Sequence, residues 1–181
     1  LYEAVQACSE FATALGINIP TGKDSLSMKQ EYPEGKVTAP GTVIITAGGQ
    51  CEAVTQIVTP ELKSEGGDLY YVDFSKAPKA LGGSAFAQLL NKIGTVVPKV
   101  TDARYFKKAF NEIQACIKSD QISAGHDIST GGLITTLLEM CFPTPKAGMA
   151  LKLDAIEAKD WVELLFSENP GVILQSKENL S

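Results

Sequence analysis

Apolar side chains recur at spacings of three and four residues at the start of the chain, which is the period of one face of an α-helix. The pattern predicts a helix over residues 1–15 that ends at Gly16. Residues 17–20 are then expected to form a short extended lead into a loop at residues 21–28. The apolar face of the predicted helix consists of Leu1, Val5, Cys8, Phe11 or Ala12, and Leu15.

Residues 42–59 are rich in β-branched side chains, which favours one or two strands interrupted near the glycine pair at 48–49. Proline and glycine at residues 60–67 mark a boundary after these strands. The run at residues 69–74 contains two tyrosines and a valine and predicts a further strand.

Helical and extended patterns alternate through the rest of the chain. The predicted elements are a helix capped by Ser84 through Ile93, a helix around residues 105–117, a strand near 122–124, a loop carrying His126 and Asp127, a helix at 133–141, a strand at 149–153, a helix at 155–166 and a strand at 172–175. This alternation predicts a layered α/β domain over residues 66–181. Because both ends of the chain fall inside such patterns, we expect it to be a piece of a longer polypeptide.

Composition is ordinary for a globular protein, with 44% hydrophobic and 20% charged residues among 181. Sixteen basic against 21 acidic residues leave a net charge of −5, which gives no electrostatic reason to expect a nucleic acid as partner. The sequence has no apolar run near the roughly 20 residues that span a bilayer, and no signal-peptide pattern. We therefore predict a cytoplasmic protein with no membrane partner.

Four cysteines are widely spaced, without a C-x-x-C pair, and the chain has one histidine. This spacing fits neither a disulfide framework nor a zinc site. We expect all four to be reduced and to act as small core hydrophobes: Cys8, Cys51, Cys116 and Cys141.

The run from Gly125 to Leu133 concentrates groups that suit a phosphate and metal site. Asp127 offers a hard oxygen for Mg²⁺, and Ser129 offers a hydroxyl for a phosphate oxygen. Gly131 and Gly132 would let the backbone approach a ligand closely. The helix that follows would add N–H groups and a positive dipole end.

Each of these residues also has a plainer interpretation. Asp127 could be an acidic cap on the following helix, and His126 could be a structural histidine rather than one that orients a ligand. Lys23, Asp24 and Ser25 could be solvated turn residues, or they could form a loop that places a point charge against a phosphate or substrate. This loop lacks the spacing of a Walker A motif.

Glu168 leaves two interpretations open as well. It could belong to a turn that ends a helix, as the following Asn-Pro-Gly favours, or it could be a structural carboxylate at a domain interface.

Four runs occur in a fixed order along the chain, namely Gly-Lys-Asp-Ser-Leu-Ser-Met at 22–28, Leu-Gly-Gly-Ser at 81–84, His-Asp-Ile-Ser-Thr-Gly-Gly-Leu at 126–133 and Phe-Ser-Glu at 166–168. Together they resemble the phosphoribosylformylglycinamidine synthase family, within the aminoimidazole ribonucleotide (AIR) synthetase superfamily. The resemblance extends over nearly the whole chain.

The resemblance implies two domain pieces. Residues 1–62 are expected to be the tail of the superfamily's strand-rich N-terminal-type domain. Residues 63–181 are expected to be most of its C-terminal-type domain, an α/β (α+β) fold with α/β/α layers and partly ferredoxin-like topology.

The resemblance implies that the acid of the His-Asp-x-Ser motif is a ligand for the Mg²⁺ of a bound adenine nucleotide. It also implies that the serine two residues later contacts the nucleotide. These roles fall on Asp127 and Ser129, with Gly131 and Gly132 beside them. The family usually has Asp where this chain has Thr130. The His-Asp-x-Ser-x-Gly-Gly form resembles the half of the enzyme that holds a structural nucleotide, so the resemblance favours an auxiliary site.

The resemblance further implies a ligase of de novo purine biosynthesis that forms a C–N bond with glutamine as nitrogen donor. Its cofactors would be Mg²⁺ and ATP or ADP, and its substrate formylglycinamide ribonucleotide. Its partners would be the remaining synthetase halves and the glutaminase domain of the same polypeptide. We expect the isolated chain to be inactive, because the other half of the active site and the glutaminase are missing from it.

Two alternatives remain open. One is another ATP-dependent synthetase or kinase of the superfamily, such as AIR synthetase or a selenophosphate or thiamine phosphate enzyme, against which the Gly-Lys-Asp-Ser-Leu-Ser-Met run argues. The other is a non-catalytic scaffold domain that binds no nucleotide by itself.

Overall fold

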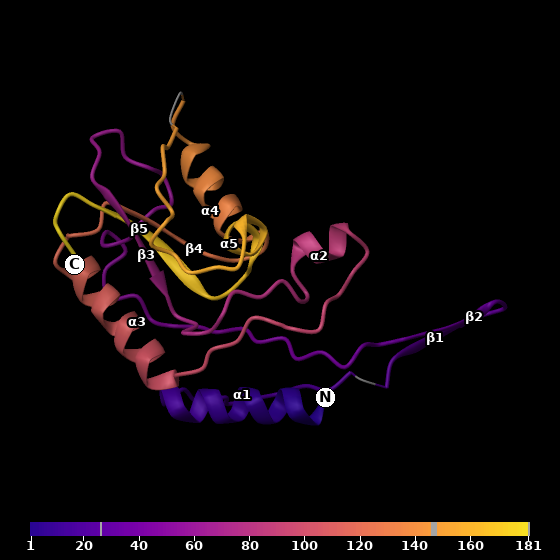
Figure 1. Ribbon diagram of the computed structural model, residues 1–181. Helices are drawn as coiled ribbons and strands as arrows, with labels where there is room; N and C mark the ends of the chain where they lie inside the picture. The colour runs from indigo at the N-terminus through magenta and orange to yellow at the C-terminus, as the bar shows by residue number, and fades with distance from the viewer. Residues whose placement is uncertain (26, 146–147, 181) are drawn as a thin grey trace. The chain divides into compact units, whose positions relative to one another are not determined.

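The computed structural model describes residues 1–25, 27–145 and 148–180. The chain divides into two units, Leu1–Cys51 and Glu52–Ser181. We describe each unit by itself, with the labels of Figure 1.

The first unit contains the predicted N-terminal helix. Helix α1 spans Tyr2–Leu15, and Gly16 terminates it in the left-handed conformation at φ 76°. A hairpin of β1 (Lys29–Tyr32) and β2 (Gly35–Thr38) follows, and every residue of both strands is exposed. The sequence did not predict this hairpin, since its strands carry no alternation of apolar and polar residues.

The strands predicted within residues 42–59 are wrong. All of these residues are described, and none lies in a strand. Ile44, Ile45 and Val54 are exposed, so their β-branched side chains have no sheet face to pack on. The nearest approach to pairing is the Thr59 carbonyl, which accepts a hydrogen bond from the Gly125 amide at 3.0 Å.

The second unit is built on a three-stranded sheet in the order β3-β5-β4, with antiparallel neighbours. Strand β3 spans Asp68–Asp73 and β5 spans Gly171–Ser176, which confirms both predictions to within one residue. Strand β4 spans Ala124–Asp127, so His126 and Asp127 lie on a strand and not in the predicted loop. Because the sheet is antiparallel, the unit is a mixed α+β fold.

The helices of this unit agree with the predictions in position more than in length. Helix α3 (Ala103–Lys118) and helix α4 (Gly132–Cys141) confirm theirs. Ser84 caps α2 as predicted, but α2 spans only Ala85–Leu89, because Asn91 adopts φ 54° and ends the pattern before Ile93.

Two predictions near the C-terminus need correction. Helix α5 spans Trp161–Phe166, capped by Asp160, and is shorter than the predicted 155–166. Residues 149–153 are described and contain no strand. Their apolar residues instead contribute Met149 and Leu153, which pack partly buried against the core.

The core lies between the sheet and the pair α4 and α5, which lie side by side in Figure 1. Its central residues are Ala124, Ile128, Leu133, Leu137, Met140, Leu164 and Ile173. On β5, Ile173 faces this core, whereas Val172 and Leu174 line a cavity with α3 on the other face, as strand alternation requires. The unit therefore has helices on both faces of the sheet.

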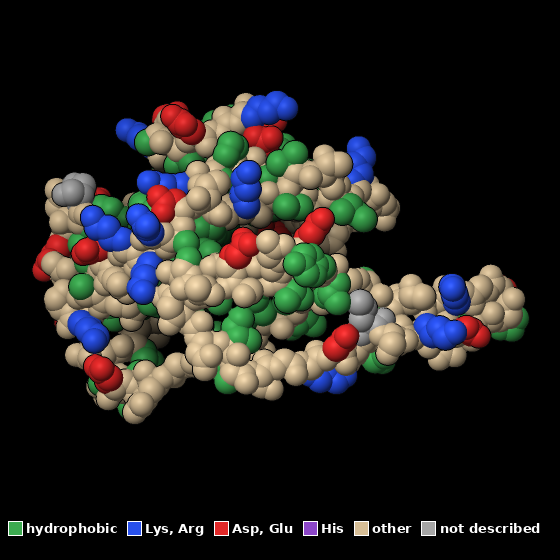
Figure 2. Space-filling model, turned by 90° about the horizontal axis from the view of Figure 1, so that it is seen from below, with side chains coloured by type: hydrophobic (Ala, Val, Ile, Leu, Met, Phe, Trp, Pro, Cys, Tyr) green, Lys and Arg blue, Asp and Glu red, His purple; other side chains and the backbone are tan. Residues whose placement is uncertain are grey.

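The surface carries mixed charges. On the face shown in Figure 2, the described Lys and Arg side chains are interspersed with Asp, Glu and apolar ones. Among the described residues, no helix is both long and apolar enough to cross a membrane.

Gly132 supplies a test of how α4 is seated. It has φ 75°, and a Cβ there would lie 2.7 Å from the Phe166 carbonyl carbon and 2.8 Å from the Leu165 and Ser167 carbonyl oxygens. We expect Gly132→Ala to lower the free energy of unfolding by about 2–4 kcal/mol, because both the backbone conformation and the contact with α5 are violated. Urea denaturation measures this change.

The matched control is Gly148→Ala, where a Cβ meets nothing within 4 Å. That variant should stay within about 0.5 kcal/mol of the parent. Equal midpoints for the two variants would show that α4 is not held against the end of α5.

Candidate functional site

Asp127 lies at the end of β4 with its side chain 71% exposed. Its Oδ1 is 3.3 Å from His126 Nδ1. The N-cap of α4 is Gly131, and no side chain forms a capping hydrogen bond there. The alternative that Asp127 caps this helix is therefore wrong, and its carboxylate remains accessible to a ligand.

His126 is held between two carboxylates. Its side chain is 18% exposed, and Nε2 lies 3.1 Å from Glu139 Oε2 on α4. With Asp127 at Nδ1, both ring nitrogens have a partner, which fixes the ring orientation. A histidine held in this way can orient Asp127 and is not placed as a free acid or base.

Ser129 and the two glycines form the turn between β4 and α4. Ser129 is exposed, and its carbonyl accepts a hydrogen bond from the Gly132 amide at 3.0 Å. The Gly131 amide donates to Glu168 Oε1 at 2.8 Å. Both glycine amides are therefore engaged within the chain, and Gly132 is a glycine because α5 packs against it. A ligand here would be held by side chains more than by these two amides.

Glu168 connects two loops that are distant in sequence. Its Oε1 accepts hydrogen bonds from the amides of Ala85 and Gly131, both at 2.8 Å. The C-cap of α5 is Ser167. Glu168 is thus a structural carboxylate, although it joins two loops of one unit and not the two domains.

Asn169 makes a similar set of contacts with a third loop, and sequence reasoning missed it. Its side chain is 1% exposed. Oδ1 accepts from the Ala80 amide at 3.0 Å, and Nδ2 donates to Ser75 Oγ at 3.2 Å and to the Pro78 carbonyl at 3.1 Å. An Asn between an acid and a proline is typical of a turn, so no local pattern indicated that the Asn169 side chain is buried.

A cavity of about 400 Å³ lies beside Asp127 and His126, between the sheet and α3. Its other walls are mostly apolar, from Val58, Pro60, Phe74, Phe110, Ile113, Ile117, Val172 and Leu174. The described lining includes no lysine or arginine. A phosphate placed here would need its charge neutralised by a metal ion or by a cation from elsewhere.

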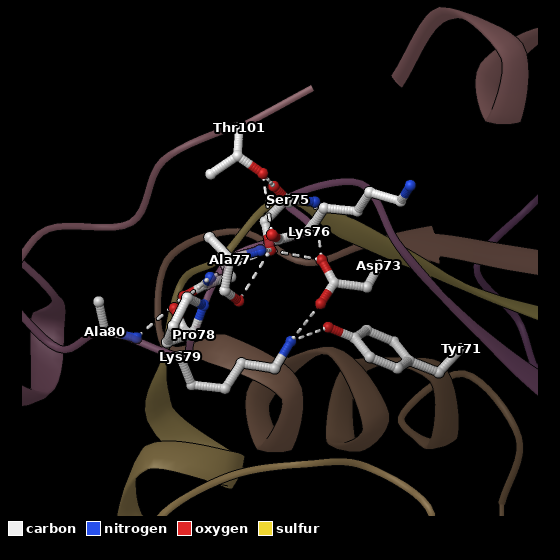
Figure 3. Close-up of polar contacts among 10 residues, drawn as sticks. Tyr71, Asp73, Ser75, Lys76, Ala77, Pro78, Lys79, Ala80 and Thr101 are labelled. Carbon is white, nitrogen blue, oxygen red and sulfur yellow. Dashed lines mark hydrogen bonds and ion pairs between the residues drawn. The ribbon is translucent and has the colours of Figure 1, made fainter. Parts of the chain in front are cut away.

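A larger cavity, of about 890 Å³, lies elsewhere and contains a cluster that sequence reasoning also missed (Figure 3). Lys79 is 5% exposed, and its Nζ lies 2.9 Å from Asp73 Oδ2 and donates to the Tyr71 hydroxyl. Burial alone would raise the pKa of Asp73, but hydrogen bonds from Ser75 and Lys79 outweigh it and hold the pKa below its ordinary value. Burial, with the Asp73 charge, raises the pKa of Tyr71.

In this cluster every charge has a partner. Asp73 also accepts from the Ser75 amide and hydroxyl at 2.7 and 2.6 Å. The cavity therefore offers no uncompensated buried charge to attract a charged ligand. We consequently place the candidate site at Asp127 and Ser129.

Lys23, Asp24 and Ser25 belong to the unit of residues 1–51. Lys23 and Asp24 are exposed, and Lys23 Nζ donates to Ser25 Oγ. Leu26, within the same run, lies outside the described residues.

Metal chemistry at Asp127 would rest on one protein carboxylate. Among the described residues, no group of three or more His, Cys, Asp or Glu side chains could hold a metal ion. Mg²⁺ is commonly held by one or two carboxylates together with phosphate oxygens and waters, so Asp127 fits that pattern.

Cys8, Cys116 and Cys141 are partly buried, whereas Cys51 is exposed. The expectation that all four pack in a core is wrong for Cys51.

The fold and this loop define a small mixed α+β domain with an exposed Asp-x-Ser turn. Residues 68–179, more than half of the chain, match the family model described as "AIR synthase related protein, C-terminal domain". The chain belongs to this family. Residues 1–50 match the model described as "FGAR-AT PurM_N-like domain".

The chain is similar to a probable phosphoribosylformylglycinamidine synthase, chloroplastic/mitochondrial, of Arabidopsis thaliana. The two are 45% identical over 183 residues, which cover 99% of this chain and 13% of the relative. The chain therefore corresponds to one segment of a much longer relative, with an AIR synthase C-terminal domain preceded by a PurM_N-like segment.

The Lys79–Asp73 pair supplies a pH-dependent test. Because the folded pKa of Asp73 is lowered, its contribution to stability is complete above the unfolded pKa, about 4. It is lost as the pH falls through the folded value. We expect Asp73→Asn to lower the free energy of unfolding at pH 7 by about 1–3 kcal/mol, since it leaves the buried Lys79 charge unpaired.

The difference between parent and variant should shrink below about pH 4, as urea denaturation across pH 2.5–7 would measure. The control is Glu157→Gln, an exposed carboxylate that lines the same cavity. A difference that stays constant with pH would contradict the assigned ion pair.

Proposed function

We propose that the chain is part of a phosphoribosylformylglycinamidine synthase and contributes a Mg²⁺-nucleotide site built on Asp127 and Ser129. The whole enzyme would convert formylglycinamide ribonucleotide to the amidine, with ATP and glutamine, as a C–N ligase of purine biosynthesis. The identity of 45% to a relative of that name supports the enzyme, and the loop geometry supports the site.

One observation carries the site. The Asp127 carboxylate, 71% exposed, is not used as the cap of α4, although the sequence places it where a cap would stand. Its only side-chain partner in the described structure is His126, which orients it. An oriented, exposed carboxylate two residues from an exposed hydroxyl suits a metal-bound phosphate.

The residues have separate tasks in this proposal. Asp127 would hold the metal ion, and the Ser129 hydroxyl would donate to a phosphate oxygen. Mg²⁺, when bound, would neutralise phosphate charge that the apolar cavity wall cannot. Gly131 and Gly132 would shape the turn, since their amides are engaged by Glu168 and Ser129.

We propose an auxiliary site over a catalytic one, on the form of the His-Asp-x-Ser-x-Gly-Gly motif. The substrate, the glutaminase domain and the remaining synthetase halves would then act elsewhere in the same polypeptide. We further propose that the boundary between the two domains lies between residues 62 and 63. Lys23, Asp24 and Ser25 would form a phosphate or substrate loop of the first domain. The whole enzyme would act in the cytoplasm.

The competing function is a scaffold domain that binds no nucleotide. Isothermal calorimetry of the 181-residue chain with MgADP separates the two functions. Binding with one site per chain supports the proposal, and no heat of binding at millimolar nucleotide supports the scaffold.

Asp127→Asn tests the metal ligand. The substitution keeps an oxygen but removes the negative charge, so we expect MgADP affinity to fall by about tenfold or more. The stabilisation of the chain by MgADP, read as a melting temperature, should fall with it, because a ligand that binds only the folded state stabilises it.

The matched control is Asp154→Asn, an exposed aspartate in a different loop. It should leave affinity unchanged. If Asp127→Asn and Asp154→Asn bind MgADP as the parent does, Asp127 is not a metal ligand.

A second expectation concerns turnover. The isolated chain should form no amidine from formylglycinamide ribonucleotide with glutamine or with ammonia, because the proposal places the reacting site outside it. Ammonia-dependent product above the no-enzyme background, measured by mass spectrometry, would show that the reacting site lies in this chain.

A further inference from the structure

The Glu168 carboxylate makes one contact that the proposed function does not use. A single oxygen, Oε1, accepts from two backbone amides, Ala85 at the start of α2 and Gly131 at the start of α4. These donors stand 83 and 37 residues away in sequence. The side chain is only partly buried and is absent from the hydrophobic core.

Gly131 is the end of the turn that carries Ser129. It adopts φ 93°, and its carbonyl accepts from Thr135 Oγ1 at 3.2 Å. The other end of the turn is also fixed, since the Asp127 carbonyl accepts from Thr136 Oγ1 at 3.0 Å. The turn of residues 127–131 is therefore pinned at both ends, while the side chains of Ser129 and Thr130 between them are exposed.

The contacts made by Thr136 and by Glu168 differ in kind. Thr136 belongs to α4 itself and is 2% exposed, so it moves with the helix. Glu168 comes from outside the helix and its turn, after α5, and its hydrogen bonds are charge-assisted, which makes them stronger than neutral ones. The start of the turn is tied to β5 by the Ile128 amide, which donates to the Gly171 carbonyl at 2.8 Å, and Glu168 ties its end at Gly131 to the segment after α5.

We propose that Glu168 is a positioning residue for the Asp127–Ser129 turn, holding it in the conformation that binds the metal and phosphate. The ligand in this inference rests on the proposed function, whereas the ordering of the turn by Glu168 is independent of that function. Without Glu168 the amides of Gly131 and Ala85 lose their acceptor, and ligand binding must include the cost of ordering the turn. The core around Met140 and Leu137 does not involve Glu168 and should persist.

The experiment compares three variants of the 181-residue chain. Glu168→Ala removes the acceptor, and Glu168→Gln keeps an acceptor oxygen of the same reach. Asp102→Ala is the control, because Asp102 also accepts from two backbone amides, Arg104 at 3.0 Å and Tyr105 at 2.9 Å, at the cap of α3.

Two readouts are taken well below the melting temperature: MgADP affinity by calorimetry, and hydrogen exchange of the Gly131 and Ala85 amides by NMR. We expect Glu168→Ala to lower affinity and to speed exchange at both amides by about tenfold or more. Glu168→Gln should stay within about threefold of the parent in both. Asp102→Ala should lose thermal stability and keep affinity.

The outcomes separate the two claims. Unchanged exchange at Gly131 in Glu168→Ala, or affinity no lower than in Asp102→Ala, overturns the positioning role. A parent that binds no MgADP overturns the proposed nucleotide site, and the exchange data still decide whether Glu168 orders the turn.

Discussion

The fold of the second unit depends on one polar segment, Ser167 to Pro170, that satisfies the backbone of three loops. Glu168 binds the amides that begin α2 and α4, and Asn169 binds both an amide and a carbonyl of the loop at residues 75–80. Buried backbone groups without partners are costly, so these loops can be held close only where such partners exist. The segment follows α5 directly. Because α5 packs into the core, its position determines where the Glu168 and Asn169 side chains lie.

This constraint explains why the glycine-containing runs lie together. Gly132 has no room for a Cβ because the backbone at the end of α5 occupies that space. Gly82 is likewise closed by the Val96 carbonyl, 2.3 Å from where a Cβ would stand. In both runs the glycine serves the packing of the chain against itself. The His-Asp-x-Ser-x-Gly-Gly pattern therefore combines a structural glycine with the exposed side chains of Asp127 and Ser129.

The sequence predicted the elements that carry their own periodicity or cap, such as α3 with its apolar spacing, α2 with its capping Ser84, and β3 with its tyrosines. It failed where propensity needed a partner, as in residues 42–59, whose β-branched side chains stay exposed. The order of motifs indicated the family, and the match of residues 68–179 to the AIR synthase C-terminal domain model confirms it. Nothing local could show that Glu168 reaches Ala85, because that contact joins residues 83 apart, or that Asn169 is buried.

The contrast between the two cavities shows how charge separates a structural cluster from a candidate site. Lys79 and Asp73 neutralise each other at 2.9 Å, and the neutral Tyr71 phenol completes the set, so a charged ligand would have to displace a formed ion pair. Among the described residues, no Lys or Arg side chain forms an ion pair with Asp127; its partner is His126, which Glu139 also contacts. A carboxylate that is oriented by a neighbour and still exposed to solvent is accessible to an added cation. Cavity size alone therefore does not single out the proposed site, which rests on the exposed and oriented Asp127 carboxylate at the end of β4.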